Sequence, residues 1–159
     1  MRKAFAGLAI LLLLVVVAQF FFAGSGAFST ASREFFRPHH ALGYVIFILS
    51  VVMTIVAALA RMPGRLIGMA ALVAGLTAVQ VVIGVLARAF GDPGDSTTAG
   101  PLIFGLHAVN GLVILAVAGM LVWQTRAVSR SAAPTRPAGA GADTGASGPV
   151  AGPAQRAAL

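Results

Sequence analysis

The chain has 159 residues, of which 58% are hydrophobic and only 9% are charged, and its formal net charge is +7. Soluble domains carry about 25% charged residues, so this composition indicates an integral membrane protein. The absence of cysteine excludes disulfides, thiolate haem ligation, Cys-ligated iron–sulfur clusters and Cys-based zinc sites.

Four apolar segments are long enough to cross a bilayer, for which about 20 residues suffice. In chain order they cover residues 4–23, 39–60, 66–87 and 102–123. A cleaved signal peptide is the alternative for the first segment, although its apolar stretch exceeds the roughly 7–15 residues of a signal core. The short Arg61–Arg65 connection makes the second and third segments antiparallel neighbours. The predicted fold is an all-α, up-down-up-down four-helix bundle over residues 1–126.

The basic residues predict the topology. With the N-terminus inside, eight of them fall in cytoplasmic segments and three in outer segments, which fits the positive-inside rule. Both termini are then cytoplasmic, and the net charge needs no nucleic-acid partner. Residues 127–159 are rich in Ala, Gly and Pro and have too little large apolar surface to fold alone, so they are predicted to form a disordered cytoplasmic tail.

A polar pattern recurs in the two halves of the chain, first Gln-x-x-x-small and then His-x-x-x-Gly. Its members are Gln19 and Ala23 with His39 and Gly43, then Gln80 and Gly84 with His107 and Gly111. Polar residues within a membrane are costly and commonly functional. The repeat predicts two parallel hairpins related by a pseudo-two-fold axis, with the second and fourth spans running in the same direction.

The repeated motif has the chemistry of a haem site. Residues four apart share a helix face, so a glycine lies one turn below each histidine and leaves a slot for a flat group. We therefore expect b-type haem between the second and fourth spans near the outer face, with His39 and His107 as axial ligands. Gly43, Gly111 and Gly84 would make room for the ring. Two imidazole ligands leave no open iron position, which favours electron transfer or haem handling.

Haem propionates need cationic or solvated surroundings at the outer interface. Arg33, Arg37 and Arg88 are expected there. His40 is an alternative ligand to its neighbour His39, although only His39 has glycine four residues on.

The two expected ligands differ in predicted depth. His107 is about five residues inside its span, near 8 Å at about 1.5 Å per residue. His39 follows Pro38 directly, so a helix that includes Pro38 in its first turn would reduce the mismatch.

Other functions stay open at this stage. The runner-up is a non-enzymatic scaffold or accessory subunit, in which the small and polar residues only pack the bundle. A zinc site from His39, His40 and His107, with Glu34 or Asp92 behind it, is a further alternative. No span contains an acidic residue or a Ser-His-Asp arrangement, so nothing supports a hydrolase, and whether the protein is an enzyme stays undecided.

Three stretches resemble one half of haem A synthase: residues 24–26, the His-His-x-x-Gly run from His39, and the Gln-x-x-x-Gly run from Gln80. That family has two four-helix halves, each with a histidine on its second and fourth helices, which is what the resemblance implies here. The family's glutamate before the first histidine is replaced by Phe36, and its following arginine by His40. Only one half is present and no cysteine pair exists, so haem A synthesis is not implied.

In length and pattern the chain is more similar to an uncharacterised group of small four-span bacterial membrane proteins, often actinobacterial. Leu106-His107 matches one of their motifs, and the abundance of Ala, Gly and Arg with a single lysine fits a high-GC genome. The resemblance implies a bacterial plasma membrane location but no established activity. The lipid bilayer is the expected surrounding, and a redox partner or homo-oligomerisation is compatible with it.

Overall fold

The computed structural model describes residues 2–28, 33–90 and 98–131. Four long helices form the molecule: α1 (Arg2–Phe28), α2 (Arg37–Leu59), α3 (Gly64–Ala89) and α4 (Ala99–Ser131). A short 3-10 helix, η1 (Arg33–Phe36), precedes α2. All four long helices are long and apolar enough to span a membrane. The all-α, four-span bundle predicted from the sequence is confirmed.

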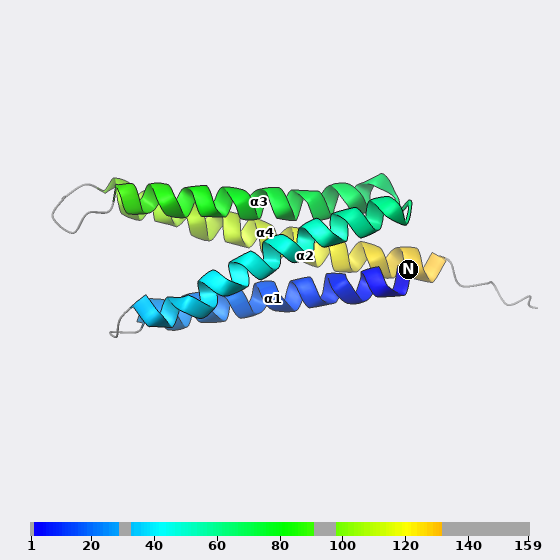
Figure 1. The fold of residues 1–159 in the computed structure, drawn as a ribbon, viewed down its shortest axis with the longest axis horizontal. Coiled ribbons are helices and arrows are strands. Elements are labelled where there is room, and N and C mark those ends of the chain that lie inside the picture. Colours follow the sequence, from blue (N-terminus) through cyan, green and yellow to red (C-terminus); the bar gives the residue numbers. More distant parts are fainter. Residues whose placement is uncertain (1, 29–32, 91–97, 132–159) are drawn as a thin grey trace, which may run out of the picture.

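The helices run up, down, up and down (Figure 1). Helices consecutive in the chain pack on each other and α1 also packs on α4, so the bundle is closed. Among the described residues no Cα pair within 8 Å joins α2 to α4, which therefore lie diagonally across the bundle. We call the end where α2 and α4 begin the histidine end, and the opposite end, where α2 turns into α3, the turn end.

The helices extend beyond the predicted apolar segments. The structure starts α1 at Arg2 and ends α4 at Ser131, so the first residues of the predicted tail continue α4. The remaining tail, residues 132–159, lies outside the described residues. Pro38 lies in the first turn of α2, where its fixed φ suits a helix start and its missing N–H costs nothing. This helix start is two residues earlier than the predicted segment, and it reduces the difference in depth between His39 and His107.

At the turn end, α2 stops in a tight backbone turn. The N–H of Met62 donates to the carbonyl of Ala57, and the N–H of Arg61 donates to that of Ala58. This pair of bonds satisfies the last carbonyls of the helix in a Schellman arrangement. Arg61 has a φ of 49°, the left-handed conformation that normally favours glycine at this position.

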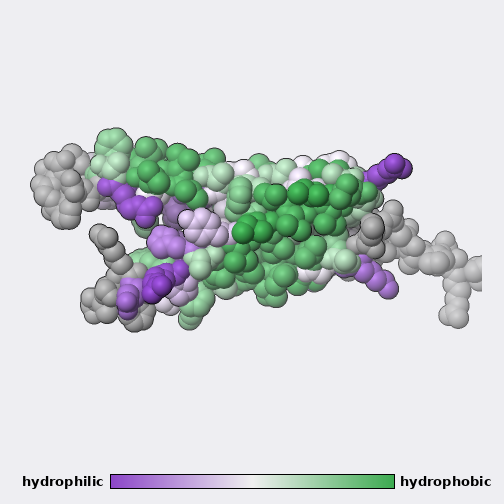
Figure 2. Space-filling view, viewed as in Figure 1, coloured by the Kyte–Doolittle hydropathy of each residue, from purple (hydrophilic) through white to green (hydrophobic). Residues whose placement is uncertain are grey.

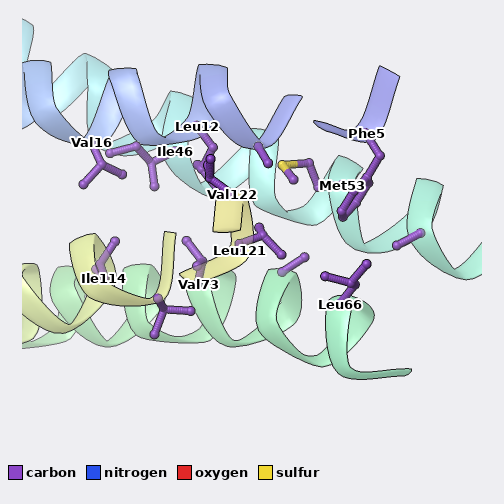
Figure 3. Close-up of a cluster of buried hydrophobic side chains, with 14 of the residues drawn as sticks. Phe5, Leu12, Val16, Ile46, Met53, Leu66, Val73, Ile114, Leu121 and Val122 are labelled. Carbon is purple, nitrogen blue, oxygen red and sulfur yellow. The ribbon is translucent and has the colours of Figure 1, made fainter. Parts of the chain in front are cut away.

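Apolar side chains from all four helices fill the middle of the bundle and its turn end. Phe5, Leu12, Met53 and Leu121 have no exposed surface, and they point into the space between the two hairpins (Figure 3). Lipid is as apolar as these side chains, so their contribution comes from close packing rather than from leaving water. Buried Ser50 donates to the carbonyl of Ile46 on its own helix, which satisfies its hydroxyl within this apolar core.

Candidate functional site

His39 and His107 meet at the histidine end across the diagonal of the bundle. His39 lies in the first turn of α2, and His107 lies about two turns into α4. Their ring centroids are 6.1 Å apart, and the ring planes are tilted by 47°. Since the backbones of α2 and α4 do not touch, only the side chains reach across the bundle. The repeat thus brings together the two histidines that the sequence singled out.

The two rings are held differently. His39 Nδ1 lies 3.3 Å from the backbone oxygen of Gln19. Since a carbonyl oxygen can only accept a hydrogen bond, Nδ1 carries the proton and donates it. Neutral His39 therefore keeps a lone pair on Nε2. Within residues 2–28, 33–90 and 98–131, the buried Nδ1 of His107 has no partner at hydrogen-bond distance. The buried side-chain oxygen of Gln19 likewise has no partner within these ranges.

The repeated glycines are contact points for the repeated glutamines. A Cβ added at Gly43 would lie 3.6 Å from Nε2 of Gln19, and one added at Gly111 would lie 3.6 Å from Nε2 of Gln80. Phe20 is closer still to Gly111, with Cζ 3.3 Å from the same added atom. The sequence predicted that both glycines leave a slot for a flat ring. In the structure side chains of α1 and α3 lie over them.

Gln80 joins α3 to α4 through a hydrogen-bond network. Its Nε2 donates to the backbone oxygen of His107 at 2.6 Å, and its Oε1 accepts from Nδ2 of Asn110 at 2.5 Å. Asn110 also donates to the carbonyl of Leu76 at 2.9 Å. In the first repeat Leu42 occupies the position of Asn110, so the side-chain oxygen of Gln19 has no corresponding hydrogen bond in the described part of the chain.

Each histidine also contacts an aromatic ring three residues before it. Phe104 stacks on His107, with centroids 5.5 Å apart and planes 3° apart. Phe36 meets His39 edge to face at 6.3 Å. The repeated unit is therefore Phe-x-x-His-x-x-x-Gly. The spacing is visible in the sequence, but the sequence analysis did not connect Phe36 with His39 and missed its counterpart Phe104.

The predicted cationic residues contribute unequally to the histidine end. Arg88, in the last turn of α3, folds back so that its guanidinium and Nδ1 of His107 each lie 3.9 Å from a Cβ added at Gly84. Arg37 is exposed, and the side chain of Arg33 lies outside the described residues. Figure 2 shows hydrophilic residues between the two hairpins at this end and an apolar surface over the middle of the molecule.

The candidate alternative ligand, His40, lies on the exposed side of α2, with its ring 5.8 Å from that of His39. No group of three or more His, Asp or Glu side chains in residues 2–28, 33–90 and 98–131 is arranged to hold a metal ion. The alternative zinc site of three histidines is thus not formed there, and Asp92 falls outside the described residues. Of the predicted metal ligands, His39 and His107 are the two whose rings meet inside the bundle.

Fold and site together define a multi-pass integral membrane protein with a histidine pair across one end of a four-helix bundle. The chain is similar over residues 19–87 to a family described as one of unknown function (DUF6220). That segment includes Gln19, His39, Gln80 and Gly84 and ends before His107. No curated protein and no solved structure matches the chain. The likeness to haem A synthase stays a prediction from short motifs.

Proposed function

We propose that this protein binds a b-type haem between His39 and His107 and uses it for electron transfer or haem handling near the outer face of a bacterial plasma membrane. The observation that carries the proposal is the meeting of the two rings, 6.1 Å apart, from helices whose described backbones have no Cα pair within 8 Å. Two metal–nitrogen bonds of about 2 Å each need ligand nitrogens about 4 Å apart, which this ring separation allows. A haem held by two imidazoles supplies one-electron chemistry.

The hydrogen bond of His39 supports its role as a ligand. Metal-binding histidines almost always donate their other ring N–H to a carbonyl, carboxylate or water, and this bond fixes the tautomer. His39 meets that requirement through the backbone oxygen of Gln19. Among the described residues, Nδ1 of His107 has no partner within normal hydrogen-bond distance, although the backbone of Gln80 lies close enough to act on the ring.

The surroundings fit the haem ring less closely than the histidines fit its iron. Gly84 places no side chain of its own beside His107, but the guanidinium of Arg88 lies 3.9 Å from a Cβ added there. The side chains over Gly43 and Gly111 would have to adopt other rotamers to admit a ring. Arg88 is the described arginine best placed for a propionate, because its guanidinium turns back towards the histidines.

An absorbance spectrum of detergent-purified protein, from cells supplied with a haem precursor, tests the proposal before and after dithionite. We expect sharp reduced α and Soret bands, lost in both His39→Ala and His107→Ala. The matched control is His40→Ala, since its exposed ring should leave the spectrum unchanged. A colourless, folded protein, or bands that survive both ligand substitutions, would contradict the proposal.

A non-enzymatic scaffold or accessory subunit is the second candidate. It is favoured by the contact of each glutamine with its glycine and by the Gln80–Asn110 network, which give the polar residues a packing role without any cofactor. In that case Gln80→Leu would destabilise the bundle, whereas His107→Ala would leave its unfolding unchanged. Under the haem proposal, His107→Ala would also lower the stability of protein purified with haem.

A further inference from the structure

The turn end of the bundle carries exposed cations that the histidine site does not use. We call them the cationic ring: Lys3 near the start of α1, Arg61 in the turn after α2, Arg65 in the first turn of α3 and Arg126 near the end of α4. Within residues 2–28, 33–90 and 98–131, Glu34 is the only acidic residue, and it lies at the histidine end in η1. The four cations therefore have no carboxylate partner in the described part of the chain.

The helix register places Arg126 just beyond the apolar part of the bundle. Gln80 of α3 donates to the backbone of His107 on α4, and this bond fixes the antiparallel register of the two helices. Carried to the turn end, the register brings Trp123 about level with Gly64, where α3 begins. Arg126 lies nearly one turn further out than Trp123 and on the same helix face, because residues three apart are neighbours on a helix surface.

Trp123 marks the membrane interface at this end, since its side chain is 69% exposed and tryptophan gathers where hydrocarbon meets headgroups. The core behind it is closed. Phe5 and Leu66 are buried and face each other at the turn end of the core (Figure 3). Figure 2 shows hydrophilic side chains on the rim of this end, next to the apolar surface over the middle of the molecule. Polar headgroups therefore meet a cationic rim and find no opening into the bundle.

We propose that the cationic ring is a binding surface for acidic phospholipids, which it selects over zwitterionic ones. An acidic lipid such as phosphatidylglycerol carries a net negative charge, whereas the phosphate of phosphatidylcholine is balanced by its own choline. Each Lys or Arg near an anionic membrane surface strengthens binding by a factor of roughly five. Three of the four cations are arginines, whose planar guanidinium matches phosphate oxygens in pairs. The surface lies at the opposite end from the histidine pair and does not depend on a haem.

The only tryptophan of the chain makes this surface measurable, because Trp123 shares a helix face with Arg126. Full-length protein is reconstituted into nanodiscs of phosphatidylcholine in which part of the lipid carries brominated acyl chains, and bromine quenches tryptophan fluorescence only at short range. We expect brominated phosphatidylglycerol to bind beside Trp123 roughly five times more strongly than brominated phosphatidylcholine, the effect of one cation on one lipid. In about 1 M salt, which screens charges beyond about 3 Å, the ratio should fall towards one.

A triple variant tests whether the named cations are responsible. Arg61→Gln, Arg65→Gln and Arg126→Gln together should bring the ratio towards one. The matched control replaces the same three arginines by lysine, which keeps the charges and should keep most of the preference. All three side chains are exposed, so both proteins should fold, and circular dichroism checks their helices.

Three results would overturn this inference: equal quenching by the two lipids in the native protein, a preference that about 1 M salt leaves unchanged, or a preference that survives in a folded glutamine variant. Each would leave the proposed function untouched, because no residue of the cationic ring lies near the histidines. Conversely, a native protein that takes up no haem should still show the lipid preference.

Discussion

Asn110 donates its side-chain amide to Oε1 of Gln80 and so ties α4 to α3 inside the bundle. Replacing it by the residue at the equivalent place in the first repeat, Asn110→Leu, removes this bond and the bond to Leu76. We expect a loss of about 1 kcal/mol in unfolding free energy, the usual scale for polar contacts between membrane helices. Denaturation of the detergent-solubilised protein measures it. The converse substitution, Leu42→Asn, should leave stability equal or higher, because it can supply the missing partner of Gln19.

η1 approaches α1 closely because residue 26 of α1 is glycine. A Cβ at Gly26 would lie 2.7 to 2.9 Å from ring carbons of Phe36, which is too close for either group. We expect Gly26→Ala to destabilise the protein by about 1–3 kcal/mol, the range for overpacking. Thermal unfolding followed by circular dichroism measures the loss.

Two variants check that the contact with Phe36 is responsible. At Gly24 an added Cβ has no described atom within 4 Å, so Gly24→Ala should be tolerated. A Phe36→Leu change added to Gly26→Ala should restore much of the loss. If Gly24→Ala proved as harmful as Gly26→Ala, helix propensity or lipid contact would be the cause instead.

The turn between α2 and α3 contains a residue whose replacement by glycine should stabilise the protein. Arg61 holds a left-handed φ of 49°, which costs a side-chain-bearing residue more than it costs glycine. We expect Arg61→Gly to raise the unfolding free energy by roughly 0.5–1 kcal/mol, after the greater chain entropy of glycine is subtracted. Arg65→Ala is the control, because it removes the same charge from an exposed helical position. A gain in both variants would indicate relief of charge repulsion, and a gain in neither would contradict the backbone argument.

The absence of native cysteine makes the predicted topology directly measurable. Thr98 and Gly64 are both exposed and lie near opposite ends of the bundle. In right-side-out membrane vesicles, Thr98→Cys should react with a membrane-impermeant maleimide, whereas Gly64→Cys should react only after the membrane is permeabilised. The reverse pattern would place the termini outside and contradict the positive-inside prediction.

The sequence predicted the helices because a membrane span has a strong compositional signal. The apolar runs gave four helices in the correct places, but they underestimated α4, which begins at Ala99 and continues to Ser131. Hydrophobicity marks the part of a helix that lipid surrounds, and it cannot mark where the hydrogen-bonded backbone continues into polar surroundings. The predicted second segment began at residue 39, whereas α2 begins at Arg37, and Pro38 suits the first helical turn in which the structure places it.

The sequence predicted which two histidines lie at the same end of the bundle, but it did not predict the contacts around them. Parallel repeats imply that His39 and His107 reach the same end, and the structure brings their rings together. The contact of Gln19 with Gly43 was not predictable, because a glycine in a membrane helix admits either a cofactor or a neighbouring side chain. Only the packing of α1 against α2 decides between these. The stacking of Phe104 on His107 followed from a repeated spacing that was present but not used.

The histidine pair lies nearer to one end of the bundle, so the two ends differ in how much of a membrane voltage separates them from the pair. His107 is about two turns into its helix and His39 barely one, whereas the remaining depth of the bundle is filled by apolar side chains such as Met53 and Leu121. A full crossing of the membrane costs or yields about 2.3 kcal/mol per elementary charge for each 100 mV. A charge that reaches the histidines from their own side crosses only a small part of that voltage. Under the haem proposal, electron exchange at this site would therefore depend less on the membrane potential than a transfer across the whole bundle.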